Sequence, residues 1–223
     1  RDFRAAITGK KPLALIAEIK QNSPSGGVLR ADFSPLAIAR DYEAGGAAAV
    51  SVLTDRKYFG GSPFMLQEVK TATRIPILRK EFIIDPYQIY EARSIGADAV
   101  LLIAAILSDE ELLKFTSLID QLGMAALLEV HNRAELARVL RFENALIGIN
   151  NRNLDTLKTD INISLDLIRD PRLKNRVVVA ESGISGANEV RSLAAAGFSA
   201  ALVGATLLQS PDIPSKIKEL LGN

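Results

Sequence analysis

The stretch Leu15–Gly27, LIAEIKQNSPSGG, joins an apolar strand to a polar loop. Alternation predicts a β-strand over 15–20, in which Glu18 and Lys20 lie on one face. A carboxylate and an ammonium are costly to bury unless they pair or meet a polar ligand. The loop that follows is rich in turn-forming residues. Alone, the pattern fits either an ion pair inside a core or a strand end that faces a ligand.

The same strand-then-helix pattern recurs along the whole chain. Eight short apolar segments, each followed by a helical one, are predicted at 15–20, 48–53, 76–80, 99–103, 126–130, 146–150, 177–181 and 201–204. Strands that are apolar on both faces are typical of a buried parallel sheet. Similar helix-to-strand junctions begin at Gly46, Gly96 and Gly197, at intervals of about 50 and then about 100 residues.

This repeat predicts an α/β fold, a (β/α)8 TIM barrel, as a single domain over residues 1–223. The alternative is an open doubly wound sheet, but eight strand–helix units in a chain of this length leave little room for that layout. Residues 1–12 are expected to form a short lead-in helix. Asn132 and Glu135 are spaced as a capping box at the start of a later helix.

Composition excludes several classes of function. Lys and Arg number 27 and Asp and Glu 26, so a net charge of +1 gives no footprint for nucleic acid or an anionic membrane. The absence of cysteine excludes disulfides, a thiol nucleophile and a Cys-zinc site, and fits a cytoplasmic protein. No apolar run approaches the roughly 20 residues that span a bilayer.

Charged and amide side chains end several of the predicted strands. They are Glu18, Lys20, Lys80, Glu129, Asn150 and Glu181. In a TIM barrel the carboxyl ends of the strands meet at one rim, where the active site lies. Such a cluster would destabilise the fold without a function, and it shifts pKa values in the way that acid–base catalysis uses.

Small residues follow the last two strands, Ser182-Gly183 and Gly204-Ala205-Thr206. They let backbone N–H groups approach an anion, and this is the usual phosphate site of the fold. The sequence therefore predicts a phosphorylated small-molecule substrate.

Seven segments, in order, carry a resemblance to a known family. They are IAEIKQNSPSGG (16–27), SVLTDRKYFGG (51–61), ILRKEFIID (77–85), LLEVHN (127–132), IGINNRNLDTL (147–157), VAESGI (179–184) and LVGATLL (202–208). On these motifs the whole chain resembles indole-3-glycerol phosphate synthase, the TIM barrel of tryptophan biosynthesis. The resemblance implies a lyase that closes the indole ring of 1-(2-carboxyphenylamino)-1-deoxyribulose 5-phosphate and releases CO₂ and water, without cofactor or metal.

The resemblance also implies roles for single residues. Lys80 would be the acid for ring closure, Glu129 the base for dehydration, and Lys20 a ligand of the carboxylate or phosphate and a second acid. Glu18 would tune Lys20, and Asn150 and Glu181 would orient hydroxyl groups. Arg152 would face the carboxylate, and phosphate would be held by Lys20, Ser182, Gly183, Gly204 and Ala205. The aromatic ring would pack on Pro24, Phe59, Phe82, Leu101 and Leu154, below a lid loop that contains Ser23 and Ser25.

Two features depart from the family pattern. Ala205 stands where many members have Ser or Thr, so backbone donors must hold phosphate there. Only about a dozen residues precede the first strand, so the N-terminal extension is expected to be shortened, by nature, trimming or engineering. His131, the single histidine, is expected to be structural, and Glu81 is expected to face the helix layer.

Other functions stay open on the sequence alone. One is an isomerase of a related aminated sugar phosphate, and another is a barrel that binds a phosphorylated ligand without turnover. We expect a cytoplasmic monomer, with association to other tryptophan-pathway enzymes as an open alternative.

Overall fold

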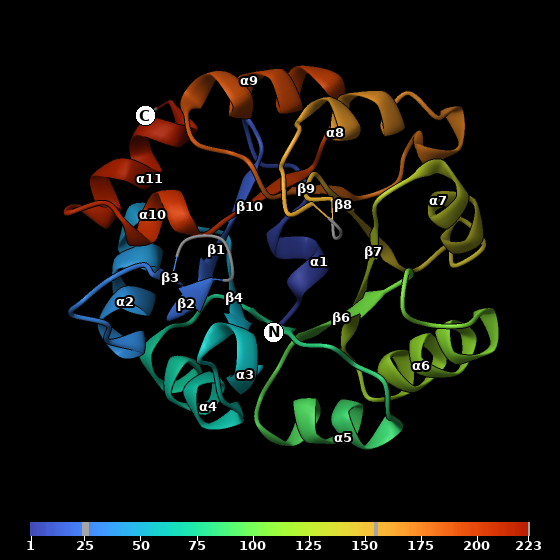
Figure 1. Ribbon diagram of the computed structural model, residues 1–223, viewed down its shortest axis with the longest axis horizontal. Coiled ribbons are helices and arrows are strands. Elements are labelled where there is room, and N and C mark those ends of the chain that lie inside the picture. The colour runs from blue at the N-terminus through green and yellow to red at the C-terminus, as the bar shows by residue number, and fades with distance from the viewer. Residues whose placement is uncertain (24–26, 154–155, 223) are drawn as a thin grey trace.

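Eight strands with both faces buried can satisfy their backbone hydrogen bonds by closing on one another, and this chain does so. The computed structural model describes residues 1–23, 27–153 and 156–222, so the predictions for Pro24, Ser25 and Leu154 lie outside the described residues. All eight strands are parallel and form a closed barrel (Figure 1) in the order β1-β10-β9-β8-β7-β6-β5-β4. The predicted TIM barrel is confirmed, and the open sheet was wrong. The strands are β1 (Ala14–Ile19), β4 (Ala49–Leu53), β5 (Ile77–Lys80), β6 (Ala99–Ile103), β7 (Ala125–Val130), β8 (Leu146–Asn150), β9 (Val178–Glu181) and β10 (Ala200–Val203).

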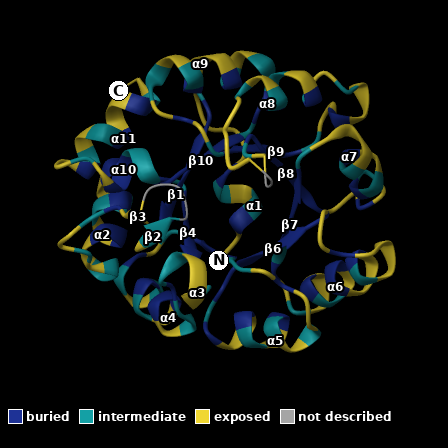
Figure 2. Cartoon of the chain, viewed as in Figure 1, coloured by how far each residue is buried: buried dark blue, intermediate teal, exposed yellow. Residues whose placement is uncertain are grey.

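Helices surround the barrel, and their buried residues face the strands (Figure 2). They are α2 (Pro35–Gly45), α3 (Arg56–Phe59), α4 (Pro63–Ala72), α5 (Pro86–Ser94), α6 (Asp109–Gln121), α7 (Arg133–Val139), α8 (Asn162–Leu167), α9 (Ala187–Ala196), α10 (Ala205–Leu208) and α11 (Ile213–Leu221), with a 3₁₀ turn at Pro171–Leu173.

Side-chain alternation divides each strand between two cores. In β1, Leu15 and Ala17 pack outward against the helices, whereas Ile16 packs inside the barrel. Glu18 continues the inward series beside Ser51 of β4, and on the opposite side Asn150 pairs in register with Glu181. The strand-end polar residues therefore share one level of the barrel.

A short helix, α1 (Phe3–Ala6), lies at the centre of the ring in Figure 1. Its Phe3 side chain and the following Ile7 are fully buried among the inner residues of the strands. The lead-in helix is thus confirmed, and it seals the inner core at the end where the strands begin.

Two short elements escape the sequence patterns. A two-stranded antiparallel ribbon, β2 (Asn22–Ser23) and β3 (Gly27–Val28), follows β1, and α3 follows β4. Elements this short show no helical or strand period. The one sequence feature that indicates α3 is its N-cap residue, Asp55. The Asp55 carboxylate accepts a hydrogen bond from the Tyr58 N–H at 2.6 Å.

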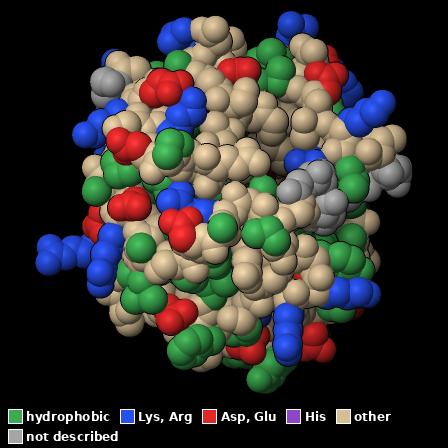
Figure 3. All heavy atoms as spheres, turned by 60° about the vertical axis from the view of Figure 1, so that its left-hand side comes forward, with side chains coloured by type: hydrophobic (Ala, Val, Ile, Leu, Met, Phe, Trp, Pro, Cys, Tyr) green, Lys and Arg blue, Asp and Glu red, His purple; other side chains and the backbone are tan. Residues whose placement is uncertain are grey.

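Acidic and basic side chains are interspersed on the face shown in Figure 3, without a single basic stripe, as expected for a net charge of +1. Among the described helices, none is long and apolar enough to cross a membrane.

Gly61 tests how tightly the loop after β4 packs against the barrel. A Cβ atom at this position would collide with the Leu53 carbonyl oxygen at the end of β4. Gly61→Ala should therefore lower the free energy of unfolding by about 1–3 kcal/mol, measured by urea denaturation. In the control Gly186→Ala, the new Cβ would meet only the flexible Glu189 side chain, at 3.1 Å. An equal loss in both variants would contradict the packing argument.

Candidate active site

A cavity of about 480 Å³ opens at the carboxyl ends of the barrel strands. This volume suits a small organic ligand. Its lining includes every strand-end residue expected to be catalytic: Glu18, Lys20, Lys80, Glu129, Asn150 and Glu181. These residues come from five different strands or their ends, so closure of the barrel brings them together.

The Lys80 ammonium is the centre of the polar cluster. Its Nζ lies 2.9 Å from Oε2 of Glu129 and 2.9 Å from Oε2 of Glu181. Both carboxylates are almost fully buried, and the lysine side chain is 15% exposed. The lysine therefore has a solvent-facing side that a ligand can reach, while its partners are held in the barrel wall.

Burial and neighbouring charges shift the pKa values of Lys80, Glu129 and Glu181 in different directions. Burial opposes the charged lysine, but Glu129 and Glu181 outweigh it and raise the pKa of Lys80 above its ordinary value. Burial also opposes ionised Glu129, but Lys80 and then His131 reverse this and lower the pKa of Glu129. For Glu181, burial and the charge of Glu129 exceed the effect of Lys80 and raise its pKa to about 7. One buried carboxyl thus stays ionised while its neighbour holds a proton near neutral pH, which suits acid–base chemistry.

Glu181 has room for its second oxygen because Gly148 of β8 has no side chain. Oε1 of Glu181 is buried without a hydrogen-bond partner among the described residues, and a Cβ on Gly148 would collide with it. An unpartnered buried carboxyl oxygen marks a position where a ligand hydroxyl can bind.

Glu18 and Lys20 form an ion pair at the end of β1. The Glu18 backbone is held by the buried Tyr42 hydroxyl of α2, which donates to the Glu18 carbonyl oxygen at 2.8 Å. Both readings of the first stretch thus apply, because the two side chains pair with each other and also line the cavity.

The loops after β8, β9 and β10 form the part of the cavity wall that adjoins β1, with Arg152, Ser182, Gly183, Gly204 and Ala205 in its lining. The Thr206 hydroxyl joins two of these loops by donating to the Ile184 carbonyl oxygen at 2.9 Å. Ser182 has φ +69°, an uncommon left-handed conformation for a residue with a side chain. Such backbone strain is concentrated at functional sites.

Apolar side chains line the side of the cavity near β4 to β6. Phe59 and Phe82 approach with ring centroids 6.5 Å apart, and Leu101 lies deeper on β6. This arrangement offers an apolar surface for an aromatic ring, next to the charged cluster.

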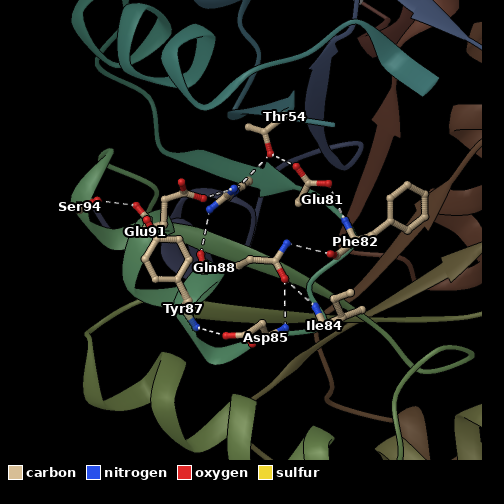
Figure 4. A network of polar contacts seen from close by, with 10 residues as sticks. Thr54, Glu81, Phe82, Ile84, Asp85, Tyr87, Gln88, Glu91 and Ser94 are labelled. Carbon is tan, nitrogen blue, oxygen red and sulfur yellow. Dashed lines mark hydrogen bonds and ion pairs between the residues drawn. The ribbon is translucent and has the colours of Figure 1, made fainter. Parts of the chain in front are cut away.

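A network of polar contacts holds the loop that carries Phe82 (Figure 4). The buried Thr54 hydroxyl donates to Oε2 of Glu81 at 2.6 Å and accepts from Nε of Arg79 at 3.1 Å. Arg79 extends to α5, where it pairs with Glu91 at 2.6 Å. The prediction that Glu81 faces the helix layer was wrong, because it binds Thr54 and lines the cavity, and the helix contact belongs to Arg79.

The other side of this loop is held by the first turn of α5. Gln88 donates to the Phe82 carbonyl at 3.0 Å and accepts from the N–H groups of Ile84 and Asp85 at 2.8 and 3.0 Å (Figure 4). The position of Phe82 at the mouth of the cavity is therefore fixed from two elements.

Some predicted and observed lining residues differ. Ser23 lies in the β2–β3 ribbon and is not among the described cavity-lining residues. Sequence reasoning missed Leu53, Asp55, Ile103, Ile106, Thr159, Ile184, Ser185, Leu202 and Val203, whereas Thr206, predicted beside the phosphate, is in the lining. Most of these residues end a strand or follow one, so their position in the strand–helix repeat was the one sequence feature that could have indicated that they line the site. No group of three or more metal-ligating side chains occurs within 1–23, 27–153 and 156–222.

Thr54 gives a test of the network that needs no ligand. Thr54→Val keeps the shape but removes the hydroxyl, leaving Nε of Arg79 and one Glu81 oxygen without this partner. Unfolding in urea should show a loss of about 1–3 kcal/mol. Thr71→Val, on an exposed turn of α4, should change stability by no more than about 0.5 kcal/mol. Equal effects would show that the network contributes nothing.

Comparison with known proteins adds independent evidence. A family model described as indole-3-glycerol phosphate synthase matches residues 1–220. An indole-3-glycerol phosphate synthase of Microcystis aeruginosa is 50% identical over 228 residues, covering 100% of this chain and 77% of that protein. One of Neisseria meningitidis serogroup B is 46% identical over 223 residues, covering 99% and 85%.

Solved structures at low identity share the fold alone. A mutant tryptophan synthase alpha subunit of Pyrococcus furiosus has a TM-score of 0.72 at 15% identity and covers 94% of this chain and 98% of that one. Thiamine phosphate pyrophosphorylase of the same organism has a TM-score of 0.69 at 14% identity, with 94% of each chain covered. The near-complete family match and the close relatives go further: this chain belongs to the indole-3-glycerol phosphate synthase family.

Proposed function

We propose that this protein converts 1-(2-carboxyphenylamino)-1-deoxyribulose 5-phosphate to indole-3-glycerol phosphate, CO₂ and water. The observation that carries the proposal is the Lys80 ammonium held 2.9 Å from both Glu129 and Glu181 on the wall of a cavity that Arg152 and Phe59 also line. Family membership supplies the substrate class. The cavity supplies the groups that each step of this reaction needs.

Ring closure forms a carbon–carbon bond between the carboxylated ring carbon and the ribulose carbonyl carbon. The carbonyl oxygen gains negative charge as the bond forms. Lys80 donates a proton to it, and the resulting group is a hydroxyl. The raised pKa of Lys80 keeps the donor form filled at neutral pH, and the proton moves when the developing alkoxide becomes the stronger base. Loss of CO₂ then returns the electrons of the carbon–carboxylate bond to the ring and restores its aromaticity.

Dehydration removes the new hydroxyl as water and needs an acid and a base. Lys20 protonates the leaving hydroxyl, and Glu129 accepts a proton from the pyrroline part of the intermediate. Because the pKa of Glu129 is lowered by Lys80 and His131, its basic form is available over the neutral range. Glu18 holds Lys20 by their ion pair.

The remaining lining residues position the flexible substrate. The backbone after β9 and β10, at Ser182, Gly183, Gly204 and Ala205, receives the phosphate together with Lys20. Arg152 faces the carboxylate, Asn150 and Glu181 bind the ribulose hydroxyls, and Phe59, Phe82 and Leu101 hold the aromatic ring. Pressing the two ends of the substrate together lowers the entropic part of the barrier.

The location and the oligomeric state of the protein are part of the same proposal. We place the activity in the cytoplasm, because a chain without cysteine fits a reducing compartment, and we propose that the protein acts as a monomer. A molar mass above one chain by light scattering, in the presence of substrate, would contradict the monomer. Association with other tryptophan-pathway enzymes would appear in the same measurement when they are added.

The activity is tested by indole fluorescence after adding the carboxyphenylamino-deoxyribulose phosphate. The chain contains no Trp, so the product signal rises from a low background. Lys80→Ala should lower kcat about 10²- to 10⁴-fold, the usual contribution of a general acid, with a smaller effect on product binding. Lys114→Ala, on the exposed surface of α6, is the matched control and should turn over normally. Normal turnover by Lys80→Ala would remove Lys80 from the acid role, and no turnover by the unmodified protein would refute the proposed function.

Gly148→Ala tests whether the placement of Glu181 matters for turnover. The added methyl group would displace the Glu181 carboxyl from its seat beside Lys80, and kcat should fall by about 10- to 100-fold. In Gly45→Ala the new Cβ meets Ile217 in the helix layer, so thermal stability should fall while kcat stays unchanged. Equal kcat values for Gly148→Ala and the unmodified protein would show that turnover does not need Glu181 at this position.

A further inference from the structure

His131, the only histidine of the chain, stands behind the site rather than in it. It is absent from the described cavity lining. Its Nε2 atom lies 3.3 Å from Oε1 of Glu129, and its Nδ1 atom lies 3.0 Å from Oε2 of Glu135. The ring is therefore placed between one carboxylate that faces the cavity and one that belongs to the helix layer.

The start of α7 fixes this ring. The Asn132 side chain accepts from the Glu135 N–H at 2.9 Å, which makes it the N-cap of the helix. The Glu135 carboxylate accepts from the His131 N–H at 2.8 Å and from the Asn132 side chain at 2.6 Å. The predicted capping box is thus shifted by one residue, because Glu135 reaches the N–H of His131 rather than that of the cap. The Glu135 carboxylate therefore contacts both the N-cap side chain of Asn132 and the backbone and ring of His131.

The charges around the ring favour its cationic form. Burial alone would lower the pKa of His131, but Glu129 and Glu135 reverse this and raise it to about 9. Glu129 itself faces Lys80 and His131, and Glu181 shares the Lys80 ammonium with it. One oxygen of Glu129 is thus directed to Lys80 and the other to His131, at 2.9 and 3.3 Å.

We propose that His131 is a positioning residue for the Glu129 base, clamped by Glu135 at the start of α7. It holds the orientation of the Glu129 carboxylate relative to Lys80, and its positive charge favours the ionised, basic form. The inference rests on the proposed function, since it assigns His131 to the same dehydration step. Without the ring, Oε1 of Glu129 loses its ion-pair contact with Nε2 of His131, and the carboxylate is held only through the contact of Oε2 with Lys80.

Turnover gives the first test. His131→Leu should lower kcat about 10- to 100-fold, as loss of an orienting partner does in other sites, while KM stays within a factor of about two because His131 does not line the cavity. The acidic limb of the kcat–pH profile should move to higher pH, since loss of the cation makes Glu129 easier to protonate. His131→Gln, which keeps a donor nitrogen but no charge, should retain more activity than His131→Leu.

The single histidine allows a second test that does not need turnover. Imidazole NMR titration of the unmodified protein should show ionisation near pH 9, well above the ordinary value of about 6.5. Glu129→Gln and Glu135→Gln should each lower this value. The matched control is Glu111→Gln, which alters the capping box of α6 and should leave the titration and kcat unchanged.

The outcomes separate the two proposals. Unmodified protein that turns over, with His131→Leu equal to it in kcat and pH profile, would overturn the positioning role and leave the proposed function standing. A titration at the ordinary histidine value, or one that Glu129→Gln does not move, would also overturn the role, even if His131→Leu fails to fold. No turnover by the unmodified protein would refute the proposed function, and the role of His131 in it as well.

Discussion

The contact on which the site depends is the Lys80 ammonium shared between Glu129 and Glu181. The three residues lie at or one residue before the ends of β5, β7 and β9, three strands that are not neighbours in the barrel. Each charge would be costly to bury alone, and removing one partner would leave the others uncompensated. The cluster therefore requires a closed barrel and a common level for its strand ends. Burial, together with the charge of Glu129, raises the pKa of Glu181 to about 7, so ionisation of this second carboxyl is opposed within the group. Perturbed pKa values of this kind are concentrated at functional sites.

In β5, neighbouring side chains point alternately into the site and into the helix layer. Lys80 points into the barrel, and its neighbour Arg79 points outward to Glu91 of α5. Both are cations in a buried setting, and each has carboxylate partners. Thr54 links Arg79 to Glu81, so the outer ion pair also holds the loop that brings Phe82 over the cavity (Figure 4). Arg79, which points into the helix layer, thereby helps to hold Phe82 in the apolar wall of the site.

Side chains in the first turns of two helices hold loops at the carboxyl ends of the barrel strands. Gln88, in the first turn of α5, binds the backbone of the loop after β5, and Glu135, in the first turn of α7, binds His131 after β7. The unsatisfied N–H groups near a helix start require such side chains in any case. In a TIM barrel these helix starts lie beside the strand ends, so capping side chains are well placed to hold the loops of the site. This explains how short loops without regular structure keep defined positions.

Features that depend on local order could be predicted from the sequence. Period-two alternation in β1 put Glu18 and Lys20 on one face, and strand–helix repetition indicated the barrel; both need only near neighbours. Position at strand ends, together with the family motifs, identified the six central polar residues of the cavity. Which of them touch depends on the folded chain, because Lys80 lies 49 residues from Glu129 and 101 from Glu181 along the sequence. The Thr54–Arg79 contact, the outward helix contact of Arg79 in place of Glu81, and the clamp on His131 also depend on strand register and helix packing. Those are long-range properties, which no local pattern of residues records.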